Sequence, residues 1–444
     1  MSVFDLNEEL LSSGATWQAE ENPISRMNDW ERRQLLGAIV PEKSRGLEAR
    51  AEVVRPVAGL PGQIDWRNYK GMNVTSVKNQ GGCGSCVAFG SLSVLESMIS
   101  IEKSMLLNLS EADFFFCSSH GPVCTGWWPQ SAYVANQTRG VCQEVLFPYA
   151  SAFPGGNIYA SPPSCVVNPK RGSNAFSYAN IHTVNSITAT KNYLYTTGPI
   201  TACFTVYSDF YHYSSGIYKH VSGGVEGAHC IAIVGYCDDN SAAGGYWICK
   251  NSWGTDWGMG GYFFIAYGQC DIDTNAKVGV SGVKLPSTIY ASIQSAAFRN
   301  VALRMDGSAV KAFSGTGGGL VNCQYTAMAW EHFSLNLQSG GTYTIGSMQF
   351  PNVFLRMDGS NVRQPLGQGS GVVNCQYTAR TWEQFTLNQQ AGGTYTIGSA
   401  QFPNVFLRMD GSGVTSPTGS GGGKVNCQYT ASTWEHFMIR DVML

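Results

Sequence analysis

A cysteine in a glycine-rich loop stands where it can act as a nucleophile. Residues 79–85 form this loop, and from Phe89 to Ile99 apolar residues recur at helical spacing. The pattern predicts a helix with Cys86 in its first turn, where unpaired N–H groups and the helix dipole lower the pKa of a thiol. The resulting thiolate attacks carbonyl carbon. The side chain of Gln80 can point at the attacked atom beside the Cys86 N–H and complete an oxyanion hole.

Two later apolar runs supply partners for this nucleophile. Residues 227–236 and 245–254 each read as a strand, joined as a hairpin by a polar turn. Counting back from a turn centred near Ser241 places Asn251 opposite Ile231, on the face that carries His229. An amide there accepts the imidazole N–H, fixes the tautomer and aims the other ring nitrogen at Cys86. A lone histidine is more often structural, but this combination predicts a nucleophilic cysteine site.

The composition limits the other classes of protein and the compartments that are compatible with this chain. The net charge of −2 gives no electrostatic case for nucleic acid or an anionic membrane surface. No apolar run approaches the roughly 20 residues of a membrane-spanning helix. Of 14 cysteines, 11 fall between Cys83 and Cys270, which favours disulfides and an oxidising compartment, either secreted or resembling a lysosome or vacuole. The first residues are acidic and show no signal peptide in this chain.

These residues carry a resemblance to the papain family of cysteine peptidases. The motifs are Gln80 with the run Cys-Gly-Ser-Cys-Val-Ala-Phe, then Gly-Ala-His at residues 227–229 and Lys-Asn-Ser-Trp-Gly at 250–254. His229 lies 143 residues and Asn251 165 residues after Cys86, close to the order and separation usual in the family. The runs at 205–210 and 215–220 are most similar to the cathepsin B branch. The resemblance covers about residues 16 to 280.

The resemblance implies a two-lobed α+β peptidase that acts on peptides without a metal or a cofactor. Cys86 would be the nucleophile, His229 the general base and acid, and Asn251 the residue that orients it, with Gln80 in the oxyanion hole. Two disulfides follow from the family's pattern: Cys83–Cys124 and Cys117–Cys165. The remaining cysteines have no pairing that can be deduced, and three are expected to be buried thiols. The six are Cys142, Cys203, Cys230, Cys237, Cys249 and Cys270, with Cys203, Cys230 and Cys249 on predicted core strands.

The resemblance also points to the substrate cleft. The expected substrate-binding residues are Gly126, Trp127, Ala228, Trp253 and Asn275. Trp127 stands where the family usually has a glycine, which leaves the non-primed specificity open. The family usually has Trp where this chain has Val87, a change in packing rather than in chemistry. The His-bearing occluding loop of cathepsin B has no counterpart between Trp128 and Tyr149, which favours endopeptidase action.

The segment before the peptidase cannot bury a core of its own. Residues 1–60 resemble a cathepsin B propeptide, which implies that they lie along the cleft and block Cys86; a disordered arm is the alternative. Residues 28–36 predict one short helix capped by Asn28 or Asp29. The peptidase domain is then expected at residues 61–286.

From residue 289 the chain repeats itself. Arg-Met-Asp-Gly-Ser begins at Arg304, Arg356 and Arg408, a period of 52 residues, and three such units fill residues 289–444. The short β runs and Asp-Gly turns predict an all-β unit that resembles a β-trefoil, most similar to fascin-like and ricin-like modules. The cysteines of the three repeats are expected to be free and buried, and the tryptophans to lie in the core; these are Cys323, Cys375, Cys427, Trp330, Trp382 and Trp434.

The sequence thus predicts a multidomain zymogen of a monomeric cysteine endopeptidase, inhibited by its own propeptide and followed by a β-trefoil for targeting. Glycan sites near Asp306, Asp358 and Asp410 are one interpretation; purely structural Asp-Gly turns are the other. The alternative from another class is a lectin-like binding protein in which the peptidase fold is an inert scaffold.

Overall fold

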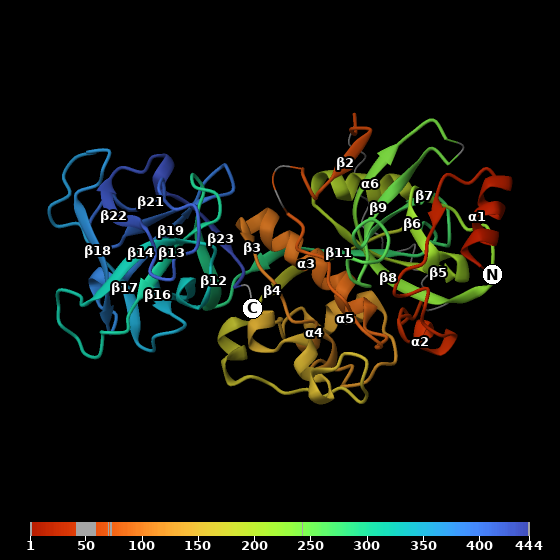
Figure 1. Cartoon of the computed structure of the whole chain (residues 1–444), viewed down its shortest axis with the longest axis horizontal. Helices are drawn as coiled ribbons and strands as arrows, with labels where there is room; N and C mark the ends of the chain where they lie inside the picture. Colours follow the sequence, from red (N-terminus) through yellow and green to blue (C-terminus); the bar gives the residue numbers. More distant parts are fainter. Residues whose placement is uncertain (1, 41–58, 70, 72, 242, 443–444) are drawn as a thin grey trace. The chain divides into compact units, whose positions relative to one another are not determined.

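The computed structural model describes residues 2–40, 59–69, 71, 73–241 and 243–442 (Figure 1). They fall into two compact units: Met1–Glu102 with Asn108–Lys284, and Lys103–Leu107 with Leu285–Leu444. Residues 41–58, which are part of the expected propeptide, lie outside the described residues. Within the described part of the chain, no helix is both long and apolar enough to cross a membrane.

The helices of the first unit begin where capping residues stand. Asn28, one of the two caps that the sequence predicts, caps the second helix and forms a reciprocal capping box with Glu31; Ser110 caps the fourth. The first helix was not predicted; it is capped by Ser2 and buries Leu6 and Leu10. The α-helices are α1 (Val3–Ser12), α2 (Asp29–Gln34), α3 (Cys86–Lys103), α4 (Glu111–Phe116), α5 (Pro129–Asn136) and α6 (Ile187–Thr196).

Helix α3 is the central element of this unit and begins at Cys86 itself. It is buried on all sides from Cys86 to Ser100, which its small residues permit. A Cβ on Gly90 would lie 3.1 Å from the carbonyl oxygen of Ile231, a tight contact, so the glycine favours this close packing of the helix on the sheet. The nucleophile candidate is therefore held on a rigid element.

A mixed sheet faces this helix, in the order β4-β11-β5-β8-β9-β10-β7, with β2 paired to β8. Its long central strand carries His229 and pairs with the strand that leads to Asn251. Ala232 pairs with Lys250 and Ile233 with Cys249, the register that the sequence predicts next to the site. The strands are β1 (Gln18–Ala19), β2 (Gln63–Asp65), β4 (Ser177–Val184), β5 (Ile200–Tyr207), β6 (Tyr213–Ser215), β7 (Ile217–Tyr218), β8 (Val225–Asp238), β9 (Gly245–Lys250), β10 (Tyr262–Ala266) and β11 (Lys277–Lys284), with β1 paired to β6.

Two disulfides close loops of this unit, Cys83–Cys124 and Cys117–Cys165, the pairs that the family resemblance implies. Cys203, Cys230 and Cys249 are free and buried, as expected. Cys142 is also free and buried, and Cys237 and Cys270 are free and half-buried.

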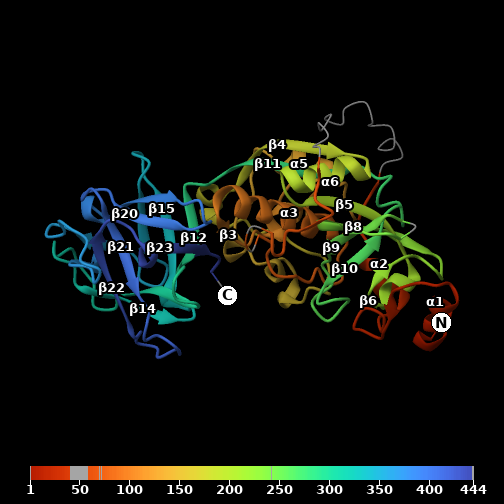
Figure 2. The ribbon, with the colours of Figure 1, turned by 90° about the horizontal axis from the view of Figure 1, so that it is seen from above.

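The second unit is built from the threefold repeat (Figure 2). Six strands pair in a closed ring, β12-β15-β16-β19-β20-β23 and back to β12, and three hairpins, β13–β14, β17–β18 and β21–β22, pair with one another through their second strands. The strands are β12 (Thr288–Ser295), β13 (Val301–Asp306), β14 (Gly319–Tyr325), β15 (His332–Leu337), β16 (Tyr343–Ser347), β17 (Val353–Asp358), β18 (Gly371–Tyr377), β19 (Gln384–Gln389), β20 (Tyr395–Ser399), β21 (Val405–Asp410), β22 (Gly423–Tyr429) and β23 (His436–Arg440).

A two-residue strand from outside the repeats completes this unit. Strand β3 (Met105–Leu106) pairs in parallel with β23, where Ile439 stands opposite Met105. The Asp441 N–H donates to the Leu106 carbonyl at 2.8 Å, and the Gln389 side chain donates to Ser104 at 2.8 Å. The sequence did not predict this strand, since two residues show no periodicity.

The motif residues of the repeat serve packing. Cys323, Cys375 and Cys427 are free and fully buried, as expected. The tryptophans are only half-buried, so the prediction that they are largely buried is wrong: each lies between the phenylalanine of a neighbouring turn and an arginine, as Trp330 does between Phe350 and Arg304. Arg304 is itself buried and donates to the Gly419 carbonyl at 3.0 Å, so it is not free to bind a ligand.

Candidate active site

His229 and Asn251 form a hydrogen-bonded pair in the interior. His229 Nε2 and Asn251 Oδ1 lie 2.7 Å apart, and the Ser252 N–H donates to the same oxygen at 2.8 Å. Because an N–H of Ser252 must donate, the shared atom is the amide oxygen, and His229 therefore carries its proton on Nε2. The Nδ1 atom has no hydrogen-bond partner among the described residues, so its lone pair is available to accept a proton.

Gln80 is fully buried, and its amide is oriented at both ends. Its Oε1 accepts from the Ser252 hydroxyl at 2.7 Å, and its Nε2 donates to the Cys83 carbonyl at 2.8 Å. The same Nε2 donates to the Leu35 carbonyl at 3.0 Å. The amide thus presents its N–H group to a carbonyl oxygen, as an oxyanion hole requires.

The Leu35 contact belongs to a segment that covers the site. The backbone N–H of Gly37 lies near the sulfur of Cys86 and favours its thiolate, and the Leu35 backbone lies at His229. One short stretch of chain thus contacts three of the residues expected in catalysis, namely Cys86, His229 and Gln80. Sequence reasoning placed residues 1–60 along the cleft but did not identify the stretch from Leu35 to Ile39. The available signal was a glycine just after a predicted helix.

Burial leaves both Cys86 and His229 uncharged near neutral pH. It raises the pKa of Cys86 to about 12, and it lowers the pKa of His229 to about 4, although Asn251 opposes the latter shift. The expectation of a lowered thiol pKa at an accessible helix start is wrong for this state, because Cys86 is fully buried. Desolvation outweighs the helix dipole here.

The wall of the cleft binds the same segment through its main chain. The Trp127 N–H donates to the Gly37 carbonyl at 2.8 Å, and the Ile39 N–H donates to the Trp127 carbonyl at 2.8 Å. Opposite them, the Ala38 N–H donates to the Ala228 carbonyl at 3.1 Å. A Cβ on Gly126 would lie 2.2 Å from the Gly37 carbonyl oxygen, so this close approach requires glycine there.

The two other expected cleft residues are buried. The Trp253 ring lies 4.7 Å from the His229 ring and shields it from water. Asn275 donates from its side chain to the Cys203 carbonyl at 3.2 Å and is only 6% exposed. Asn275 therefore has its amide engaged in the interior in this structure.

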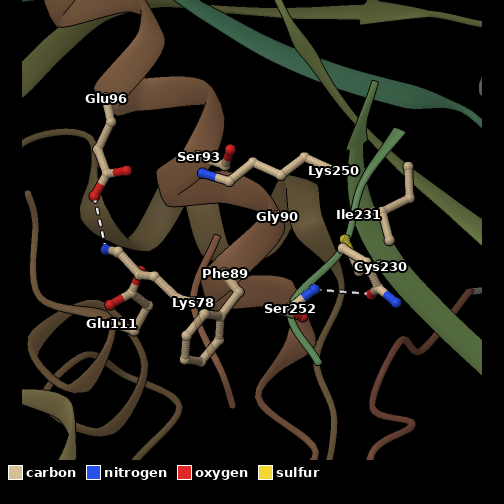
Figure 3. Close-up of a pocket in the computed structure, with 11 residues that line it drawn as sticks. Lys78, Phe89, Gly90, Ser93, Glu96, Glu111, Cys230, Ile231, Lys250 and Ser252 are labelled. Carbon is tan, nitrogen blue, oxygen red and sulfur yellow. Dashed lines mark hydrogen bonds and ion pairs between the residues drawn. The ribbon is translucent and has the colours of Figure 1, made fainter. Parts of the chain in front are cut away.

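A buried charge cluster lies behind the site and was missed by sequence reasoning (Figure 3). Lys78 bridges Glu96 at 2.9 Å and Glu111 at 2.6 Å, and Lys250 donates to Thr75 at 3.0 Å. Burial lowers the pKa of Lys250 to about 8. Figure 3 shows the Lys250 ammonium pointing towards Ser93 on α3, so the cluster fixes the strand before Asn251 against the helix that carries Cys86.

Comparison with known proteins identifies the family. The model of the papain family of cysteine proteases matches residues 60–280. Ananain from Ananas comosus is 33% identical over 245 residues, which cover 54% of this chain and 64% of ananain. Cathepsin B-like CP3 from Giardia intestinalis is 30% identical over 293 residues, which cover 60% of this chain and 93% of that protein.

The structure of proCathepsin B S9 from Trypanosoma congolense superimposes with a TM-score of 0.54 at 24% identity, covering 63% of this chain and 98% of that one. This likeness shows the fold, including the part before the peptidase. The chain belongs to the papain family of cysteine proteases.

Proposed function

We propose that the protein is a cysteine endopeptidase made as a proform. One observation supports this most directly: His229 has Nε2 committed to Asn251 and Nδ1 free, while the segment from Leu35 to Gly37 contacts His229, Cys86 and Gln80 together. A base of fixed tautomer beside a helix-start thiol is the arrangement that nucleophilic catalysis needs.

In this mechanism His229 Nδ1 takes the Cys86 proton and the sulfur attacks the scissile carbonyl. Gln80 Nε2 and the Cys86 N–H stabilise the oxyanion. The imidazolium then donates its proton to the leaving amine, which leaves a thioester on Cys86. Water, deprotonated by His229, hydrolyses the thioester and restores the thiol.

Residues 1–60 act as the inhibitory propeptide, and the segment from Leu35 to Ile39 blocks access to Cys86. Its anchor lies upstream: Trp17 donates to the Lys219 carbonyl at 2.9 Å, and Asn22 donates to the Tyr211 carbonyl at 2.9 Å. Arg33 pairs with Glu226 at 3.1 Å. Removal of the segment would expose Cys86 and the Trp127 wall to substrate.

The second unit is a β-trefoil that targets the peptidase to glycans or to its substrates. The closed ring of six strands and the three hairpins support the trefoil, as does the threefold sequence repeat. The two disulfides favour an oxidising compartment, secreted or lysosome-like.

The test is hydrolysis of a fluorogenic peptide after proteolytic removal of residues 1–60, for the native chain and for Cys86→Ala. We expect turnover in the native chain alone, and its loss with a thiol-directed inhibitor. Absence of turnover in the activated native chain would favour the inert-scaffold alternative.

A further inference from the structure

Two free cysteines stand opposite each other in the sheet that faces α3. Cys203 on β5 and Cys230 on β8 are partners in the antiparallel register, and both are buried. Residues directly opposite each other on antiparallel strands point to the same face, with Cβ atoms about 4.5–5.5 Å apart. Their Cα atoms lie about 4.5–5.5 Å apart, which is within the range that a disulfide spans. The register thus places two thiols where one bond can join them.

The other free cysteines on the described strands have no such partner. Cys249 on β9 is fully buried in the same sheet, but it stands opposite Ile233 and Phe263. The remaining four stand opposite glutamine and tyrosine or opposite leucine and glycine; they are Cys237, Cys323, Cys375 and Cys427. The opposed pair is therefore a particular feature of β5 and β8.

This pair lies next to the groups proposed for catalysis. Cys230 directly follows His229, and its backbone N–H lies near the sulfur of Cys86 and favours the thiolate there. A Cβ on Gly90 of α3 would lie 3.2 Å from the sulfur of Cys230, so this thiol faces the helix that begins at Cys86. The same register pairs Phe204 with His229, and these two rings lie 6.0 Å apart. A change in the spacing of β5 and β8 at the thiol pair therefore moves His229, one residue away.

We infer that Cys203 and Cys230 are a disulfide-forming site, and that closure of this disulfide lowers the activity of the peptidase reversibly. The effect on activity rests on the proposed function, whereas the formation of the bond does not. A disulfide holds its two Cβ atoms about 3.8 Å apart, so closure draws the strands together by about 1 Å at this point. A displacement of about 1 Å in a catalytic group costs up to about 100-fold in rate.

The oxidant is a small-molecule disulfide, for which oxidised glutathione is the probe. The thiolate of one cysteine attacks a sulfur of this disulfide and releases one glutathione thiolate; the thiolate of the other cysteine then attacks the mixed disulfide and releases the second. The two protons of the protein thiols end on the two glutathione molecules, so one protein disulfide forms as one glutathione disulfide is reduced. Burial raises the pKa of the Cys230 thiol well above its ordinary value, so we expect the exchange to be slow.

The bond is tested first in the Cys86→Ala proform, which removes the nucleophile from the thiol chemistry. The protein is incubated overnight with oxidised glutathione at about pH 8, which increases the thiolate fraction, and is then digested without reduction. Mass spectrometry should detect a peptide pair joined through Cys203 and Cys230, and dithiothreitol should separate it. Absence of this peptide pair, in a digest that still contains the Cys83–Cys124 disulfide, would overturn the inference.

The effect on activity is tested by the reactivation of oxidised, activated enzyme with dithiothreitol, followed with a fluorogenic peptide. Glutathione attached to Cys86 is removed in a fast phase in every chain, because the cleft is then open. The native chain should show a second phase at least about tenfold slower, because the buried bond is less accessible to the reductant. Cys203→Ala and Cys230→Ala should each lack this phase.

Cys249→Ala is the matched control and should keep the slow phase, because it removes a buried thiol of the same sheet that has no opposing cysteine. A slow phase that persists in Cys203→Ala and Cys230→Ala, or that is missing from the native chain, would overturn the effect on activity. If the fully reduced, activated chain cleaves no peptide, the proposed function fails, and the peptide pair in Cys86→Ala still decides whether the disulfide forms.

Discussion

Replacing Gly37 with alanine adds one methyl group, and we expect this change to weaken the binding of the inhibitory segment. The backbone of Gly37 lies outside the left-handed region, so alanine is tolerated locally. The obstacle is contact: a Cβ there would lie 1.9 Å from the carbonyl oxygen of Gly84 and 2.3 Å from its carbonyl carbon. Gly84 follows the disulfide-bonded Cys83, so the segment rather than the wall must move.

The size of the effect follows from the hydrogen bonds that such a shift breaks. A displacement of about 1 Å takes hydrogen bonds of 2.8 to 3.1 Å beyond the normal range. Four bonds are lost, those of Gly37, Ala38 and Ile39 and that from Gln80 to Leu35. At about 0.5–1.5 kcal/mol each, the loss is about 2–6 kcal/mol, or at least about 30-fold in affinity.

The assay is inhibition of the activated enzyme by a separately added peptide of residues 16–60. The native peptide should inhibit, and the Gly37→Ala peptide should have a Ki at least about 30-fold higher. Glu20→Ala is the control, because Glu20 is exposed and uses only its main chain, through its N–H to the His212 carbonyl. Equal inhibition by the native and Gly37→Ala peptides would refute the seating of residues 35–39 in the cleft.

The remaining predictions concern the catalytic groups and the second unit. Cys86→Ala should abolish hydrolysis while the thermal midpoint of the proform, followed by circular dichroism, stays nearly unchanged. Asn251→Ala should lower kcat less than His229→Ala, because water can partly replace an orienting amide but not the base; the opposite ranking would reverse the two assignments. In the proform, Cys86 and His229 have pKa values of about 12 and about 4, so both are neutral at pH 7. Removing the segment should expose both groups and reduce these two shifts. Alkylation of Cys86 by iodoacetamide should then become at least about tenfold faster. A stop after Ser287 should leave kcat/KM for short peptides within about twofold but weaken binding to glycan-bearing particles; a glycan array on the second unit tests that binding directly.

The local geometry around Cys86 and His229 could be predicted because each part has a strong local signal. A glycine loop before an apolar helical pattern located the start of α3 at Cys86, and the hairpin count placed Asn251 on the face of His229. The cap at Asn28 fixed the start of α2. These features depend on residues close together in sequence or on one short turn.

Features that depend on distant contacts could not be predicted. Burial raises the pKa of Cys86, and the residues near Cys86 in the sequence do not indicate that burial. Two acidic side chains of the covering segment make their contacts within that segment: Glu21 pairs with Arg26, and Glu31 caps α2. The ion pair to the enzyme uses an arginine of the segment, Arg33, with Glu226.

The contacts of the covering segment also explain how a peptide can occupy a peptidase site without being cut. Attack requires a carbonyl carbon in front of the sulfur, with its oxygen at Gln80. Here Gln80 holds the carbonyl oxygen of Leu35, whereas the segment group near the sulfur is the N–H of Gly37, two residues further along. The bridge between Ala38 and Trp127 is parallel, and it holds the segment in this position. In the proposed mechanism, the segment therefore occupies the wall and the oxyanion hole that a substrate would use, while Cys86 meets a hydrogen-bond donor instead of an electrophile.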